Sequence, residues 1–353
     1  MNMNMFETRT MLPILADDCR AKSFLRDRYF GNVVNFDTEW LDIDIVGPGN
    51  RRMAPFVHPK IGGKTMEREG YSTKAYKAPE ISPDMITTAE DFFKRAPGET
   101  IYNAKSPSER AAEQLGRDLA DLDDIITRRE EWMCSQALFT GQIEIKGDGY
   151  DEVLNYWPTE EAEKPVTTPA ALWTADNADP LKDLEAVRYD MIKMSGINPV
   201  ECIMGRNAWL AFREWLGTGD NAKFELDTIH VKLGEVDAQY MPNGLTYRGY
   251  FNEIAMRIYT YDDWYTDEDG TLKPFIPEND ILIAGNNVRT TMAYGLVSLF
   301  RENGTAPTFW AGARIPDSWN QRKNPAGRVV QIKSRPLPII HQIYGFHVLK
   351  PLG

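Results

Sequence analysis

The chain has 353 residues, 42% of them hydrophobic, and its 52 acidic and 40 basic side chains leave a net charge of −12 at pH 7. The length predicts about two domains with a sizeable core, and the hydrophobic content excludes a disordered chain. The acidic excess disfavours a protein that holds nucleic acid along its whole surface, because phosphate binding requires a basic footprint.

The cysteines and the N-terminus indicate the compartment. Cys19, Cys134 and Cys202 are odd in number and widely spaced, which argues against a disulfide framework and for a reducing compartment. The first residues show no basic stretch followed by an apolar one, so no secretory signal is expected. No run of eighteen apolar residues is present, so no membrane-spanning helix is expected either. We therefore predict a soluble, intracellular globular protein.

The N-terminal third combines an arm with an extended segment. Residues 1–35 are mixed in character, with a short helix indicated around residues 17–25. In residues 35–45 the large apolar side chains fall near alternate positions, which is the period of a strand. Residues 51–77 carry seven basic and two acidic side chains, a net charge of +5, and have no helical period. They predict a long β-hairpin or extended loop that buries little surface by itself.

A long helix is predicted over residues 106–140. Ser106, Pro107 and Glu109 match a capping box with proline at the first helical position. Apolar residues then recur at spacings of three, four and seven, and Gly141 supplies a stop. The helix would be about 50 Å long. Its four basic and eight acidic side chains give it a net charge of −4.

The remainder predicts a mixed α+β architecture. A hairpin is expected at residues 142–157, a loop at 158–178, helices at 180–194 and 207–216, strands at 200–205, 245–250, 254–261 and 280–284, and an acidic turn at 267–270. The tail at 329–348 alternates apolar residues with Pro336 and Pro338, which favours edge strands over a central sheet.

No catalytic, cofactor or metal site satisfies the spacing that its chemistry requires. Gly63-Lys64-Thr65 resembles the end of a phosphate-binding loop, but His58 occupies a position that needs glycine. The acidic turn fails as a calcium loop, because its first and last ligand positions hold no carboxylate. The histidines lack zinc spacing. Carboxylate pairs such as Asp123 and Asp124 leave a carboxylate-dependent hydrolase as a distant alternative. We predict no enzyme, no cofactor and no metal.

Several stretches carry a resemblance to a known family. They are residues 24–30 (FLRDRYF), 275–286 (FIPENDILIAGN), 293–295 (AYG), 313–319 (ARIPDSW), 324–326 (NPA) and 331–338 (QIKSRPLP). With the order of arm, extended loop, long helix, central domain and return strands, they resemble the tailed-phage major capsid proteins of the lambda-type E family. Members of that family adopt the Hong Kong 97-type capsid fold. The resemblance covers nearly the whole chain, apart from residues 158–178 and 262–270.

The resemblance implies an α+β Hong Kong 97-type capsid fold in five parts. These are an N-terminal arm (1–35), an extended β-hairpin loop (the extension loop, 36–105) that reaches an adjacent subunit, a peripheral domain with the long spine helix (106–179), an axial domain (180–314), and return strands of the peripheral domain (315–353). Copies would form the hexamers and pentamers of an icosahedral shell that encloses phage double-stranded DNA.

The same resemblance implies the partners and the location. The partners would be further copies, a scaffolding protein, a portal and a decoration protein, and the virion would be assembled in the bacterial host cytoplasm. An acidic shell would enclose DNA without binding it in a sequence-specific way. An encapsulin-like nanocompartment shell remains the alternative with the same fold.

Opposite charges on the extension loop and the spine helix predict a contact between copies. The basic candidates are Arg51, Arg52, Lys60, Lys64, Arg68, Lys74 and Lys77. The acidic candidates are Asp118, Asp121, Asp123, Asp124, Glu130 and Glu131. The alternative is that both sets are solvated faces, whose exposed ion pairs contribute at most ~1 kcal/mol each.

Overall fold

The chain divides into two units in the computed structural model. The model describes residues 11, 23–38, 40–46, 53–54, 56–58, 71–88, 90–91, 106–147, 149–217, 244–300, 307–323 and 325–353. Unit 1 comprises Met1–Leu41, Tyr76–Cys134 and Thr291–Pro338. Unit 2 comprises Asp42–Ala75, Ser135–Thr290 and Ile339–Gly353. The five-part division expected from the sequence stays a prediction.

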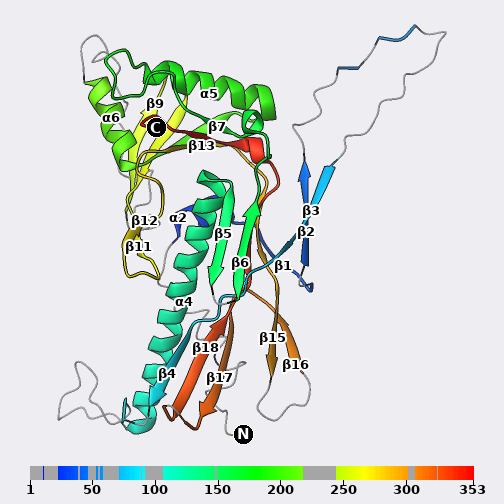
Figure 1. The fold of residues 1–353 in the computed structure, drawn as a ribbon, viewed down its shortest axis with the longest axis vertical. Helices are drawn as coiled ribbons and strands as arrows, with labels where there is room; N and C mark the ends of the chain where they lie inside the picture. The colour runs from blue at the N-terminus through cyan, green and yellow to red at the C-terminus, as the bar shows by residue number, and fades with distance from the viewer. Residues whose placement is uncertain are drawn as a thin grey trace. The chain divides into compact units, whose positions relative to one another are not determined.

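The described helices and strands follow the order shown in Figure 1. The helices are α2 (Phe24–Tyr29), α4 (Pro107–Phe139), α5 (Pro180–Ser195) and α6 (Arg206–Leu216). The strands are β1 (Val33–Asn35), β2 (Trp40–Val46), β3 (Tyr71–Lys77), β4 (Asp84–Thr88), β5 (Gln142–Gly147), β6 (Tyr150–Asn155), β7 (Val166–Thr167), β8 (Pro199–Met204), β9 (Leu245–Phe251), β10 (Met256–Tyr261), β11 (Trp264–Thr266), β12 (Leu272–Pro274), β13 (Ile281–Gly285), β14 (Thr290–Tyr294), β15 (Leu296–Phe300), β16 (Pro307–Ala311), β17 (Ile315–Gln321), β18 (Gly327–Lys333), β19 (Pro336–Ile340) and β20 (Phe346–Leu349). Among these described helices, none combines the length and the apolar character that crossing a bilayer requires.

Local sequence explains both ends of α4. The Ser106 side chain accepts the Glu109 N–H at 3.3 Å, and the Glu109 carboxylate accepts the Ser106 N–H at 2.8 Å. These are the reciprocal bonds of a capping box. Beyond the other end, Gly141 has a φ of 65°, a left-handed conformation that favours glycine. A Cβ at Gly141 would also lie 1.9 Å from the Trp157 ring. The helix predicted over 106–140 is confirmed.

Similar signals bound α5. The Asp179 side chain accepts the Lys182 N–H at 3.2 Å, and Pro180 stands in the first turn, as its fixed φ allows. The helix ends at Gly196, whose φ is 77°. The predicted helix at 180–194 is therefore confirmed, as are α6, the β5–β6 hairpin and strands β8, β9, β10 and β13.

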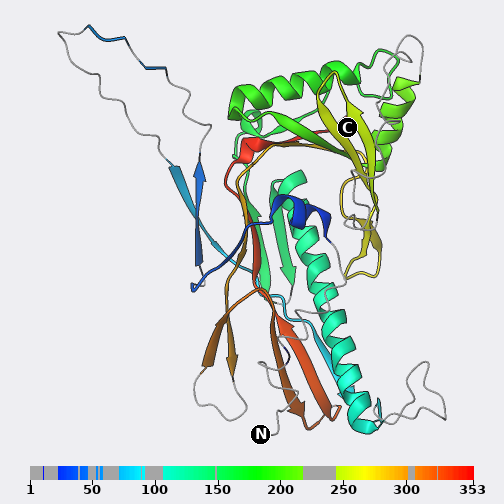
Figure 2. The ribbon, with the colours of Figure 1, turned by 180° about the vertical axis from the view of Figure 1, so that it is seen from behind.

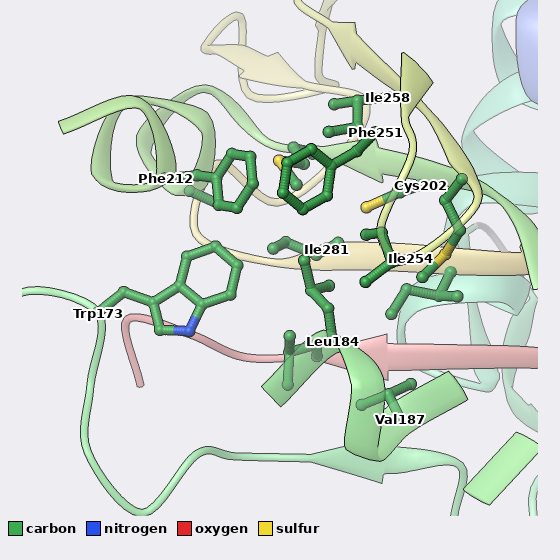
Figure 3. Close-up of a cluster of buried hydrophobic side chains, with 14 of the residues drawn as sticks. Trp173, Leu184, Val187, Cys202, Phe212, Phe251, Ile254, Ile258 and Ile281 are labelled. Atoms are coloured by element: carbon green, nitrogen blue, oxygen red, sulfur yellow. The ribbon is translucent and has the colours of Figure 1, made fainter. Parts of the chain in front are cut away.

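Unit 2 is built around a six-stranded sheet. Its order is β7-β20-β13-β8-β10-β9. Apart from the buried Glu201, strands β8 and β13 are apolar, and they are almost entirely buried, as is typical of strands covered on both faces. Figure 3 shows part of the core: the Phe212 ring of α6 lies 5.7 Å from the Trp173 ring and 6.1 Å from the Phe251 ring, between centroids. Leu184 of α5 is buried in the same cluster.

Unit 1 packs the apolar stripe of α4 against an antiparallel sheet of order β17-β18-β4. Leu119 and Ile126 of α4 are buried together with Val330 and Ile332 of β18. Leu119 and Ile126 are seven residues apart, which places both side chains on one face of the helix. Figure 2 shows this sheet alongside α4 from behind. A second sheet has the order β1-β14-β19, with β1 parallel to β14.

Two predictions about strands are wrong. The tail strands are not all edge strands: β18 lies between β17 and β4, and β20 lies between β7 and β13. Only β19, which contains both prolines, lies at the end of its sheet. Neighbours in a sheet come from distant parts of the chain, so the local pattern did not reveal them. The loop predicted at 158–178 also contains β7, which pairs with β20.

Other predicted elements are only partly described. The strand predicted at 35–45 is divided, because β1 ends at Asn35 and β2 begins at Trp40. The helix predicted around 17–25 lies mostly outside the described residues, and α2 begins at Phe24. In the extended segment, β2 and β3 form a two-stranded sheet, in agreement with the predicted hairpin. Residues 59–70 of that segment lie outside the described part of the chain.

Candidate functional site

The acidic side of α4 is largely an interior surface. Asp118, Asp123, Glu130 and Glu131 are buried, and none exposes more than 6% of its surface. Asp121 is exposed, and Asp124 is half-buried. A buried carboxylate requires a partner within the chain, because leaving one unpaired costs about 3–5 kcal/mol.

Glu131 binds the start of helix α2. Its Oε1 accepts the N–H groups of Phe24 and Leu25 at 3.0 and 2.8 Å, and its Oε2 accepts the N–H of Arg26 at 3.0 Å. Ser23, the N-cap residue of α2, provides no side-chain cap of its own. Glu131 therefore supplies from α4 the negative charge and the acceptors that a helix N-terminus favours.

Glu130 holds two arginines from distant segments. Arg314 donates to it through Nη1 at 2.6 Å and through Nη2 at 3.0 Å, and Arg26 donates through Nη1 at 2.8 Å. Arg314 also donates from Nε to Asp123. The planar guanidinium suits this fork of contacts, which a lysine does not reproduce. We refer to Arg26, Asp123, Glu130, Glu131 and Arg314 as the Arg314 network.

The charges of the Arg314 network compensate one another. Burial favours loss of the proton from Arg314, but Glu130, Tyr294 and Asp123 together outweigh that effect and raise the pKa of the guanidinium above its ordinary value. Burial, and next the charge of Glu130, raise the pKa of Tyr294, which keeps its hydroxyl neutral. The two arginines face three carboxylates, and the third carboxylate, Glu131, is compensated by N–H groups of α2.

Asp118 joins α4 to strand β4. It accepts the Thr87 hydroxyl at 3.1 Å and the Gln114 amide at 2.6 Å. Burial raises the pKa of Asp118, and these two hydrogen bonds oppose the rise. Asp118 is thus also occupied within the subunit, and Asp121 and Asp124 are the acidic candidates with accessible surface. Asp124 forms a 3.7 Å ion pair with Arg128 one turn later.

The basic candidates lie mostly outside the described residues. This applies to Arg51, Arg52, Lys60, Lys64 and Arg68. Lys74 and Lys77 belong to β3, and Lys77 is half-buried. A contact between copies therefore stays a prediction, and the burial of the other four carboxylates limits its acidic side to Asp121 and Asp124.

No local sequence pattern predicts the arginines that hold unit 1 together. Arg26 is 104 residues from Glu130, and Arg314 is 184 residues from it. Arg335 likewise binds Glu80, with Nη2 at 2.6 Å and Nε at 3.1 Å. No local period signals such pairs. Arg26, Arg314 and Arg335 all lie in stretches that carry the family resemblance, and that resemblance is the sequence feature that distinguishes them.

Of the motifs considered for metal and phosphate binding, the acidic residues 267–270 are described and form a turn, whereas residues 63–65 lie outside the described residues. Gly270 has a φ of 74°, and its N–H donates to the Asp267 carbonyl at 2.9 Å, so residues 267–270 form a turn as predicted. Lys273 pairs with Asp267. Within the described residues, no group of three or more His, Cys, Asp or Glu side chains is arranged to hold a metal ion. Cys134 and Cys202 are buried free thiols.

Two of the described segments with exposed large apolar side chains concern paired strands. One is the β2–β3 segment, where Trp40, Met53 and Phe56 are 59%, 88% and 107% exposed. The other is the β15–β16 hairpin, where Phe300 and Phe309 are 72% and 60% exposed. Exposed apolar groups of this size are typical of surfaces that another molecule covers.

Comparisons with known proteins match nearly the whole chain. The family model described as phage major capsid protein E matches residues 7–346. The major capsid protein of Escherichia phage lambda is 23% identical over 347 residues, covering 96% of each chain. The major capsid protein of Enterobacteria phage P21 is 22% identical over 346 residues, with the same coverage.

Solved structures share the fold. A structure described as the capsid protein of a prophage of Escherichia coli CFT073 superposes with a TM-score of 0.66 at 21% identity, covering 97% of this chain and 98% of its own. A phage-related protein from Bordetella bronchiseptica RB50 gives a TM-score of 0.52 at 12% identity, covering 97% and 96%. The α+β arrangement with a long helix is therefore a fold that the chain shares with these two structures.

Proposed function

The chain belongs to the phage major capsid protein E family, and from that premise we propose how its parts build a shell. Membership makes it a structural protein of the phage head, which self-assembles into the shell of the virion. It is not an enzyme, and the hydrolase alternative is excluded. The remaining question is which surfaces of the subunit meet other copies.

The extension loop, residues 36–105, reaches onto an adjacent subunit. The observation that carries this proposal is the exposure of Met53 and Phe56, whose side chains are 88% and 107% exposed. A two-stranded ribbon such as β2–β3 gains little stability from its own packing. Covering these side chains against a neighbour would remove apolar surface from water at about 25 cal/mol per Å². The neighbour thus stabilises what the subunit alone leaves exposed.

The other parts follow the family pattern. Residues 1–35 act as an N-terminal arm, 106–179 and 315–353 form the peripheral domain, and 180–314 form the axial domain at the capsomer axes. Copies associate as hexamers and pentamers of an icosahedral shell around double-stranded DNA. Scaffolding protein, a portal and a decoration protein are the expected partners. The net charge of −12 supports a shell that repels the genome rather than binds it.

Substitution of Phe56 tests the extension loop. Phe56→Ser removes most of the apolar contact, and we expect it to reduce shell formation strongly while the far-UV circular dichroism of the subunit stays unchanged. Phe56→Leu keeps an apolar side chain and is the matched control, which should assemble nearly as well as the wild type. Shells counted by electron microscopy give the readout. Normal assembly of Phe56→Ser would overturn the proposal.

The charge contact between copies involves Asp121 and Asp124 on the acidic side. Reversing Lys60 and Lys64 to Glu should impair assembly, and adding Asp121→Lys and Asp124→Lys should restore it. The buried carboxylates are left intact, because changing them would disrupt the subunit itself. Independent, additive effects of the two reversals would contradict the contact.

A further inference from the structure

The β15–β16 hairpin of unit 1 has one buried face and one exposed face. Val297 and Leu299 are buried with Ile315, and Trp310 packs against them. The opposite face consists of three cross-strand pairs: Leu296 with Ala311, Ser298 with Phe309, and Phe300 with Pro307. Paired residues of an antiparallel ladder lie on the same face, so both exposed phenylalanines point away from the unit 1 core.

This exposed face carries no charge. None of the ten residues of β15 and β16 is Asp, Glu, Lys or Arg. Charged residues make up 26% of the chain, and the described hairpins β5–β6 and β11–β12 each contain a lysine. Proteins usually place charges on such exposed two-stranded segments to prevent association. The hairpin lacks that protection.

A surface without charge suits contact with its own copy. Where identical surfaces meet at a symmetry axis, a residue close to the axis lies near the same residue of the other copy. A charged side chain close to the axis would face its own sign, which the uncharged β15–β16 face avoids. We propose that the exposed face of the β15–β16 hairpin meets the same face of a neighbouring copy at a symmetry axis of the shell, with Phe300 and Phe309 at the centre of the contact.

The size of the face indicates when the contact forms. At 72% and 60% exposure, the two phenylalanines together present roughly 250 Å². A stable pair of proteins buries about 800 Å² on each partner. The hairpin contact is therefore too small to hold a free dimer. It forms when other contacts have already brought the copies together in the shell, so the inference rests on self-assembly of the protein.

Two substitutions of opposite charge at Phe309 test whether the hairpin face of one copy contacts the same face of another copy. In Phe309→Asp subunits and in Phe309→Lys subunits, every copy brings the same charge to the axis, so each variant alone should give at least tenfold fewer shells than the wild type. An equal mixture of the two variants places opposite charges together, and at least half of the wild-type yield should return. Far-UV circular dichroism and sedimentation velocity establish that each free variant is folded and monomeric.

Leu272 provides the matched control. It is 68% exposed, on strand β12 of unit 2. Leu272→Asp and Leu272→Lys introduce the same charges, and mixing them should not raise the yield above that of the separate variants. A gain on mixing at Leu272 would mean that rescue is unspecific and would overturn the assignment to the hairpin. The pair Phe300→Asp and Phe300→Lys repeats the test at the second ring.

The other possible results for the Phe309 variants also decide whether the hairpin face meets its own copy. If both Phe309 variants assemble like the wild type, the hairpin is not a contact. If both fail and the mixture also fails, the face meets a different surface, and the contact between like faces is wrong. If shells form normally but lose a further protein of the head, the occupant is that protein. Wild-type subunits must assemble in parallel, because their failure would instead count against the proposed shell architecture.

Discussion

The Arg314 network and the β15–β16 hairpin both belong to unit 1, and they invert the usual distribution of charge. The network buries the carboxylates of Asp123, Glu130 and Glu131, with Glu130 fully inaccessible, and half-buries Arg26 and Arg314. The hairpin exposes Phe300 and Phe309 to water. Buried charges are tolerated where each one has a partner, and exposed aromatic rings are tolerated where a partner molecule covers them. The first arrangement stabilises one subunit, and the second serves the association of many.

Removing the centre of the network should have the largest effect on the subunit. Arg314→Met leaves Glu130 and Asp123 without their shared donor, so we expect the free energy of unfolding to fall by about 3–5 kcal/mol. Urea denaturation of the unassembled subunit measures it. Arg128→Met is the control, because Arg128 is 52% exposed and pairs with Asp124 on the surface, where a pair contributes about 0.3–0.5 kcal/mol. Equal losses for the two variants would contradict a larger stabilising effect of the buried network.

His347 is a buried titratable group held by a hydrogen bond, in contrast to the ion-paired side chains of the Arg314 network. His347 of β20 is 9% exposed and shares a 2.8 Å hydrogen bond with the Thr167 hydroxyl. Burial lowers the pKa of His347 to about 4, and Asp190 offsets this only in part. The unfolded chain takes up the proton near pH 6.5.

The sign of the pH effect at His347 follows from that difference. Between pH 6.5 and pH 4 the unfolded state binds more protons than the folded state, so stability falls as the pH falls. The loss due to this group is about 3 kcal/mol by pH 4. We expect His347→Gln to show a shallower decline of unfolding free energy between pH 7 and pH 4. If the unfolding free energy of the variant and of the wild type falls equally steeply between pH 7 and pH 4, His347 does not cause the decline.

A smaller loss of stability is expected from changing Glu131, the residue of the network that binds the start of α2. In Glu131→Gln the side-chain amide nitrogen faces an N–H donor of α2, and the negative charge at the helix N-terminus is lost. We expect a loss of about 1–3 kcal/mol and faster tryptic cleavage at Arg26 and Arg28, which lie in α2. Asp121→Asn, at an exposed position of α4, should leave both unchanged. Unaltered cleavage in Glu131→Gln would mean that other contacts hold α2.

The elements that the sequence predicted well are those with local causes. The capping box at Ser106 and Glu109, and the left-handed glycines after α4 and α5, act within a few residues. The hairpin β15–β16 was missed because its strands are short apolar runs that periodicity does not distinguish from helix. The Arg314 network was missed for a different reason. A charge on a predicted helix indicates a solvated face unless a distant arginine is known to reach it.

We expect the paired charges to hold the subunit and the uncharged hairpin to hold the shell. The most direct test measures unfolding free energy and shell yield for Arg314→Met and Phe309→Asp side by side. We predict that Arg314→Met loses about 3–5 kcal/mol, whereas Phe309→Asp stays within about 0.5 kcal/mol of the wild type and yields at least tenfold fewer shells. Wild-type shell yield from Phe309→Asp, or a loss of stability as large as that of Arg314→Met, would contradict the claim.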